Sequence, residues 1–117
     1  MACLIRPRLL GSWTTTTMGK IIYGLLSRAS DLLRECGWDS KAQWFDERGK
    51  MLRNVRLGSE EYEVILNDID TALAGMGSFS DLPLSPKSDR LTVQQARDQQ
   101  WELVEAIGNV VDELRAR

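Results

Sequence analysis

The fold class is decided by residues 20–36, which read KIIYGLLSRASDLLREC. Their apolar residues recur at steps of three and four, a spacing that places them on one face of an α-helix. That stripe contains Ile21, Ile22, Leu25, Leu26, Ala29, Leu32, Leu33 and Cys36. Gly37 follows at the position where a left-handed C-terminal cap is expected. The sequence therefore predicts an amphipathic helix over 20–36.

Three more segments farther along the chain repeat this periodicity. Their expected bounds are Asp39 or Ser40 to Gly58, Ser59 to Gly75, and Thr92 to near the C-terminus. Ser40 with Gln43, and Thr92 with Gln95, have the spacing of a capping box. No segment alternates with period two, so we expect no sheet. The predicted fold class is all-α: a small four-helix bundle with a long irregular loop, residues 75–91, between the third and fourth helices.

The start of the chain differs in character from the rest. Residues 1–20 carry three bases and no acid; the whole chain has 15 and 17, so the remaining residues carry 12 bases and 17 acids, a net −5. Arg6, Pro7 and Arg8 interrupt an apolar run that is too short for a signal peptide or a membrane span. We therefore expect a disordered leader over 1–19, a single helical domain over 20–117 and a cytoplasmic location.

The composition excludes several classes of chemistry. The 117 residues include no histidine and two cysteines. Histidine-dependent catalysis, an all-cysteine zinc site and a disulfide framework are therefore ruled out, and Cys36 is expected to be a buried free thiol. A net charge of −2 is unlike the basic excess of a nucleic-acid binder. We expect no enzymatic activity, no cofactor and no metal, and infer that the protein works by binding.

Charge is divided between the second and third predicted helices. Residues 41–56 have a net charge of +3. Residues 59–74 contain no base and five acids: Glu60, Glu61, Glu63, Asp68 and Asp70. One interpretation is that two solvated faces attract each other across a helical hairpin. The other is that the acidic helix is a docking face for a basic partner, because complementary fields speed encounter and reject wrong partners.

Trp101 lies about one-third of a turn off the apolar stripe of the last predicted helix. It is either covered by the 75–91 loop or exposed as an anchor for a partner, since tryptophan is enriched among interface hot spots.

The loop that begins at residue 75 is unusually apolar for a connection between helices. Met76, Phe79, Leu82 and Leu84 are expected to fold back onto the bundle. Its motif consists of Gly75, Met76, Gly77, Ser78, Phe79, Ser80 and Asp81. The glycines favour positive φ angles, and the serine and aspartate side chains favour bonds to local backbone amides. Both a packed structural loop and a binding loop that uses Ser78, Ser80 and Asp81 are compatible with this composition.

Residues 75–82, GMGSFSDL, resemble the GMGSFNDL core of an uncharacterised family of small bacterial helical proteins. Gln43, Trp44 and Phe45 look like the tryptophan-rich second helix of that family, and Trp101 looks like the tryptophan of its last helix. The chain departs from the pattern at Ala74 and Ser80. The family has no established activity. The resemblance implies a small stand-alone helical protein similar to immunity proteins, which neutralise a toxin.

Two functions follow as hypotheses. The first is an immunity- or antitoxin-like inhibitor that binds a cognate protein, such as a basic toxin, without direct nucleic-acid or membrane binding. Its partner-binding residues are expected to be Glu60, Glu61, Glu63, Asp68, Asp70 and Trp101. The alternative is a small-molecule or peptide-binding module with a cavity between the 75–85 loop and the bundle, where Ser78, Asp81 and Trp101 orient the ligand. Self-association is compatible with both.

Overall fold

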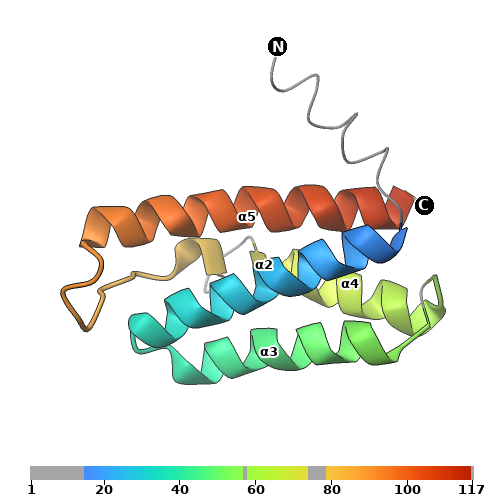
Figure 1. Cartoon of the computed structure of the whole chain (residues 1–117), viewed down its shortest axis with the longest axis horizontal. Helices are drawn as coiled ribbons and strands as arrows, with labels where there is room; N and C mark the ends of the chain where they lie inside the picture. The colour runs from blue at the N-terminus through green and yellow to red at the C-terminus, as the bar shows by residue number, and fades with distance from the viewer. Residues whose placement is uncertain (1–14, 57, 74–78, 117) are drawn as a thin grey trace, which may run out of the picture.

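A computed structural model describes residues 15–56, 58–73 and 79–116 of the chain. These residues form four α-helices and one short 3-10 helix, and they contain no strand (Figure 1). The helices are α2 (Thr15–Glu35), α3 (Asp39–Asn54), α4 (Glu60–Leu73) and α5 (Val93–Ala116), with the 3-10 helix η1 (Phe79–Asp81) between the last two. The predicted all-α fold class is therefore confirmed for the described part of the chain.

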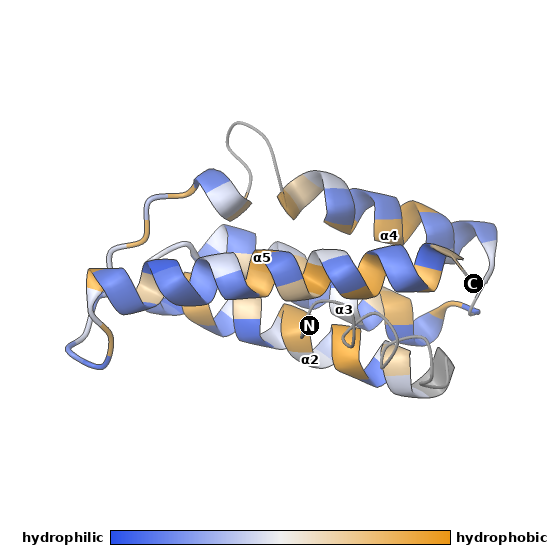
Figure 2. Cartoon of the chain, turned by 90° about the horizontal axis from the view of Figure 1, so that it is seen from above, coloured by the Kyte–Doolittle hydropathy of each residue, from blue (hydrophilic) through white to orange (hydrophobic). Residues whose placement is uncertain are grey.

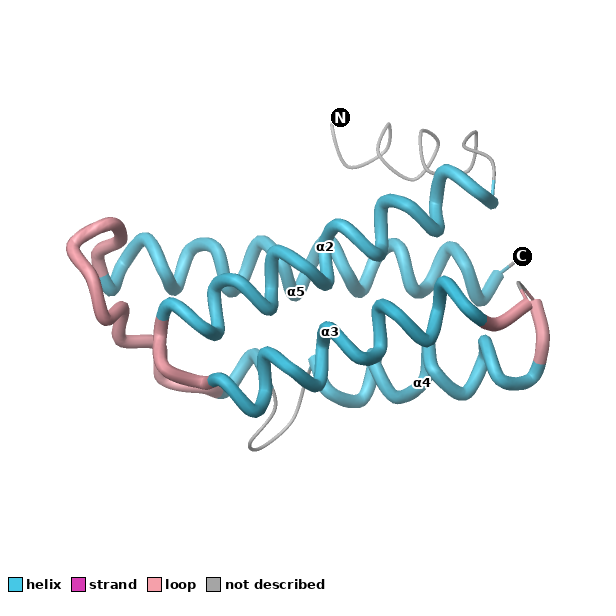
Figure 3. The backbone as a smooth tube through the Cα atoms, turned by 60° about the horizontal axis from the view of Figure 1, so that its bottom comes forward, coloured by secondary structure: helices cyan, strands magenta, loops and turns pink. Residues whose placement is uncertain are grey.

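Consecutive helices run in opposite directions and lie side by side. Helices α2 and α4 run one way in Figure 1, and α3 and α5 run the other way. Each helix packs against its neighbour in the chain, and α2 also packs against α5. Figure 3 shows the α2–α3 link and the segment before α5 at one end of the molecule, and the α3–α4 link at the opposite end. Short links between antiparallel helices produce this arrangement.

The four helices share one apolar core, and η1 and the residues after it add to it. Each helix carries both hydrophobic and hydrophilic residues along its length (Figure 2). The most deeply buried large side chains include Ile22, Leu26, Leu33, Leu66, Ile69, Leu103, Ile107 and Val111. Phe79, Leu82 and Leu84 are also buried, as the apolar character of that segment predicts. Met76 lies outside the described residues.

The first helix begins earlier than its sequence pattern predicts. Helix α2 starts at Thr15 rather than at Lys20. Met18 is fully buried, four residues before the buried Ile22, so it continues the apolar stripe by one more turn. Residues 15–19 therefore belong to the helix rather than to the predicted leader. Residues 1–14 lie outside the described part of the chain.

Two of the predicted N-terminal caps are present. The backbone N–H of Tyr62 donates to Ser59 Oγ at 3.2 Å, which caps α4. At α5, Gln95 N–H donates to Thr92 Oγ1 at 3.0 Å and Thr92 N–H donates to Gln95 Oε1 at 2.9 Å. This pair is a complete capping box. At the other end of α2, Gly37 has a φ of +86°, the left-handed conformation predicted for a C-terminal cap.

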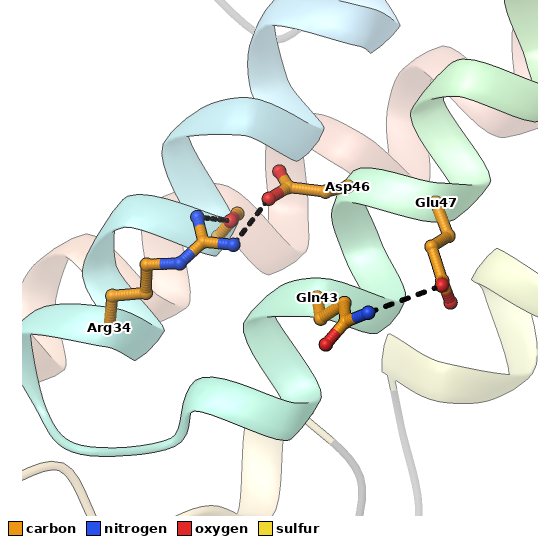
Figure 4. Close-up of polar contacts among 5 residues, drawn as sticks. Arg34, Gln43, Asp46 and Glu47 are labelled. Atoms are coloured by element: carbon orange, nitrogen blue, oxygen red, sulfur yellow. Dashed lines mark hydrogen bonds and ion pairs between the residues drawn. The ribbon is translucent and has the colours of Figure 1, made fainter.

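Helix α3 begins at Asp39, one of the two predicted starts, but the predicted cap at this start and the predicted end of the helix are wrong. The N-cap residue is Trp38, which makes no side-chain hydrogen bond, so neither Asp39 nor Ser40 caps the helix. Gln43 instead donates to Glu47 Oε2 at 3.5 Å (Figure 4). The helix ends at Asn54 rather than at Gly58, because Val55 adopts an extended conformation. Gly75, the predicted end of α4, lies outside the described residues.

Candidate functional site

Helix α4 turns one face into the core and the opposite face to solvent. Its buried residues are Tyr62, Ile65, Leu66, Ile69 and Leu73, which recur with helical spacing. Its five acids lie among the remaining positions, and the structure divides them into two groups. One group forms ion pairs within the molecule, and the other does not.

Asp68 and Asp70 are held by the helices on either side of α4. Asp68 Oδ2 lies 3.7 Å from Arg48 Nε of α3, and Asp70 Oδ2 lies 3.5 Å from Arg115 Nη1 of α5. The first distance is too long for a hydrogen bond, and the buried Arg48 Nε has no hydrogen-bond partner. The attraction across the hairpin predicted from the charge division is thus made at Asp68.

Glu60, Glu61 and Glu63 behave differently. All three side chains are exposed, and none forms an ion pair or side-chain hydrogen bond with another described residue. Val64, the next residue, is 57% exposed. We call these four residues the acidic end of α4. They present three carboxylates that have no partner among the described residues, beside one exposed apolar side chain.

Trp101 is exposed but lies away from the acidic end of α4. Its side chain is 57% exposed, so the alternative in which a loop covers it is wrong. Helix α4 begins at the end of the molecule where α5 ends (Figures 1 and 3), whereas Trp101 lies in the first half of α5. The antiparallel packing of α4 and α5 therefore separates Trp101 from Glu60, Glu61 and Glu63. The predicted partner-binding set does not form one surface.

Residues 79–84 of the predicted loop motif are fixed to the helices by polar and aromatic contacts. The side chain of Gln100 is buried, and its Nε2 donates to Phe79 O at 2.6 Å and to Leu82 O at 3.0 Å. The Phe79 ring packs edge-to-face on Phe45, with ring centroids 5.4 Å apart. Trp38 Nε1 donates to Pro83 O at 3.1 Å. This part of the motif is therefore a packed structural element.

Of the predicted binding residues Ser78, Ser80 and Asp81, the structure describes only the last two. Ser80 is half-buried and Asp81 is exposed, and both interact within the chain. Gly75, Met76, Gly77 and Ser78 lie outside the described residues. A role for Ser78 in binding stays a prediction.

A cavity of about 270 Å³ lies between α3, the last turn of α4 and η1. It is lined by Ser40, Lys41, Trp44, Phe45, Ala72, Phe79 and Leu82. Neither Asp81 nor Trp101 is among these described lining residues. The lining instead comes from three aromatic rings, two aliphatic side chains, one hydroxyl and one ammonium group. The cavity lies between two residues of the 75–85 loop, Phe79 and Leu82, and the bundle, which is where the alternative hypothesis expects a cavity.

A second, more polar cavity of about 490 Å³ lies beside α2 and α5, with Arg28, Arg34 and Glu35 among its lining residues. Three of its charged side chains, those of Arg28, Arg34 and Glu35, have partners within the chain. Arg28 Nη2 lies 3.2 Å from Glu102 Oε1. Arg34 donates to Asp46 Oδ2 at 2.6 Å and to the buried Ser30 Oγ at 2.7 Å (Figure 4). The hydrogen bond that Arg34 donates to Asp46 raises the pKa of Arg34, and this contact joins α2 to α3.

Cys36 lacks the environment of an activated nucleophile. It is a free thiol, half-buried against the core. Burial raises the pKa of the thiol, and the charge of Glu35 raises it further. Reactive cysteines have a lowered pKa, because the thiolate is the nucleophile. Cys36 therefore stays protonated at neutral pH and acts as a packing residue.

No family model, curated protein or solved structure matches this chain. The family resemblance carried by residues 75–82 therefore stays a prediction. Among the described helices, none is both long enough and apolar enough to cross a membrane.

Proposed function

We propose that this chain is a protein-binding module that docks a basic partner through the acidic end of α4. The observation that carries the proposal is the contrast within one helix. Asp68 and Asp70 are paired with Arg48 and Arg115, whereas the carboxylates of Glu60, Glu61 and Glu63 have no partner among the described residues. In this proposal the four helices form a bundle, and residues 75–91 are its closing loop.

The physical basis is electrostatic complementarity. Three carboxylates within one turn produce a concentrated negative potential, which attracts a basic surface and raises the rate of encounter. The exposed Val64 beside them offers apolar contact that a charged patch alone lacks. Acids in the first turn also stabilise a helix through its dipole. An experiment must therefore separate binding from helix stability.

The most specific form of this proposal is an immunity- or antitoxin-like inhibitor that acts in the cytoplasm without catalysis or a cofactor. A toxin that acts on nucleic acid carries a basic site for phosphate, and the carboxylates of the acidic end would compete for that site. The resemblance of residues 75–82 to a family of small helical proteins supports this form.

The test is growth rescue by co-expression with the protein encoded by the adjacent gene. We expect the wild-type chain to relieve the toxicity of that protein and to co-purify with it. The variant E60Q/E61Q/E63Q should lose both properties, because it removes three charges with little change in shape. The matched control D68N/D70N should keep both. The proposal fails if the triple variant rescues growth as well as the wild type does.

A further inference from the structure

The cavity between α3, α4 and η1 has the walls of a ligand site rather than of a packing defect. Three aromatic rings line it, from Trp44, Phe45 and Phe79. Trp44 packs edge-to-face on Phe45 at 5.1 Å between ring centroids, and Phe45 packs on Phe79 at 5.4 Å. Predominantly apolar and aromatic walls with few polar groups are typical of small-molecule sites.

The far wall of this cavity is held in place by a buried polar contact. Phe79 and Leu82 belong to η1 and the residue after it, and Gln100 of α5 donates to both of their carbonyl groups. Gln100 is only 3% exposed, so these bonds form away from water and resist exchange. The wall is therefore fixed before a ligand enters, which lowers the ordering cost of binding.

The polar groups among the lining residues come from the first turns of α3. They are the hydroxyl of Ser40, the ammonium group of Lys41 and the indole N–H of Trp44. Lys41 forms no ion pair with another described residue, and none of the described lining residues carries a carboxylate. An aromatic chamber with one unneutralised cation at its edge favours a ligand with a flat apolar body and one negative charge.

We propose that this cavity binds a small aromatic carboxylate, with its ring against Trp44, Phe45 and Phe79 and its carboxylate beside Lys41. The volume of about 270 Å³ is slightly below the range of roughly 300–1,000 Å³ that holds drug-sized ligands, which limits the ligand to one or two fused rings. Ala72 borders the cavity at the last turn of α4, at the opposite end of that helix from Glu60. Ligand binding in the cavity can therefore be tested independently of the proposed protein-binding function.

The experiment is an NMR titration of the ¹⁵N-labelled full chain with 2-naphthoate and with its neutral analogue 2-naphthamide. We expect 2-naphthoate to shift the indole N–H signal of Trp44 while leaving that of the exposed Trp101 unchanged. The carboxylate should bind about tenfold more tightly than the amide, as expected for one charge-assisted hydrogen bond. Absence of any Trp44 shift, or equal shifts at Trp44 and Trp101, would overturn the proposal.

Three variants assign the roles of the lining residues. Lys41→Met should remove the preference for the carboxylate and leave binding of the amide unchanged. Lys50→Met, an exposed position on the same helix that does not line the cavity, should behave like the wild type. Ala72→Leu should fill the cavity and abolish binding of both probes, with an unchanged circular dichroism spectrum as the control for folding. A Lys41→Met variant that keeps the full carboxylate preference would also overturn the proposal.

Discussion

The two ends of helix α4 carry similar charges in different environments. At its C-terminal end, Asp68 and Asp70 pair with the flanking helices, and η1 packs nearby through the hydrogen bonds of Gln100. At its N-terminal end, Glu60 and its two acidic neighbours face solvent without a partner among the described residues. The difference shows that acidic composition alone does not define a docking face. Charges become available to a partner only where the fold leaves them unpaired.

The largest effect on stability is expected near the C-terminal end of α4, where Gln100 holds η1 in place. Replacing Gln100 by Met keeps the side-chain volume but leaves the Leu82 carbonyl without its donor and the Phe79 carbonyl with only the Leu82 N–H at 3.4 Å. We expect a loss of about 2 kcal/mol in the free energy of unfolding, since a buried unsatisfied carbonyl costs on the order of 1–3 kcal/mol. Urea denaturation measures it. Gln99→Met is the matched control and should change stability little, because Gln99 forms no side-chain hydrogen bond within the described structure. Equal stability of the two variants would contradict the conclusion that the hydrogen bonds of Gln100 stabilise the packing of η1.

The next largest effect on stability is expected at the N-terminal cap of α4, directly before the acidic end. Ser59→Ala removes the side-chain acceptor of the Tyr62 N–H and should lower stability by about 1 kcal/mol. Ser40→Ala is the control at the start of α3, where no side chain caps the helix, and it should be close to neutral. Thermal or urea unfolding of both variants compares them. An equal loss at Ser40 would mean that the capping assignment is wrong.

Smaller effects are expected from the paired acids. Asp68→Asn and Asp70→Asn should each cost less than about 1 kcal/mol, because both ion pairs are partly exposed and screened by solvent. The cost should shrink further in high salt. Unfolding measured at low and high salt tests this. A cost that does not depend on salt would show that the two aspartates act through packing rather than charge.

At neutral pH the smallest effect belongs to two groups with a raised pKa. Burial raises the pKa of Cys36 and of Tyr62, the latter on the inner face of the acidic end. Each group ionises more readily in the unfolded chain, so its contribution to stability is full below the ordinary pKa and is lost as the pH rises through the raised value. We expect the free energy of unfolding to fall as the pH is raised from about 7 to about 11. Cys36→Ala and Tyr62→Phe should each flatten that fall, and an unchanged slope would contradict the assignment.

Much of the fold follows from local sequence. The apolar stripes predict four helices, and Ser59 and Thr92 mark two of the helix starts because their caps depend on residues three positions away. Local signals misplace the cap of one helix and the start of another. Helix α3 begins at Asp39, one residue before the predicted cap Ser40. Helix α2 extends into a threonine-rich stretch, because Met18 is buried in the core. The stripe that contains Met18 is recognisable only once the core is known.

The candidate site was less predictable because it depends on long-range contacts. The spacing of Gln100 from Ala96 and Leu103 places it on the buried face of α5, but the Phe79 carbonyl that it reaches lies 21 residues away in the sequence. The sequence does not distinguish the paired acids of α4 from the unpaired ones, because the partners of Asp68 and Asp70 lie on α3 and α5. The sequence analysis groups Trp101 with the acids only because tryptophan and complementary charges both favour binding at protein interfaces. The antiparallel order of α4 and α5 separates them.

The central claim is that the unpaired acids, and not the paired ones, bind the basic partner. The most direct test measures the affinity for the co-purified partner at about 50 mM and about 300 mM salt, a range in which surface charges become strongly screened. We expect the wild-type chain and D68N/D70N to bind tightly at low salt and to weaken together as salt rises. E60Q/E61Q/E63Q should bind weakly at both concentrations, with little dependence on salt. A triple variant with wild-type affinity and wild-type salt dependence would contradict the account.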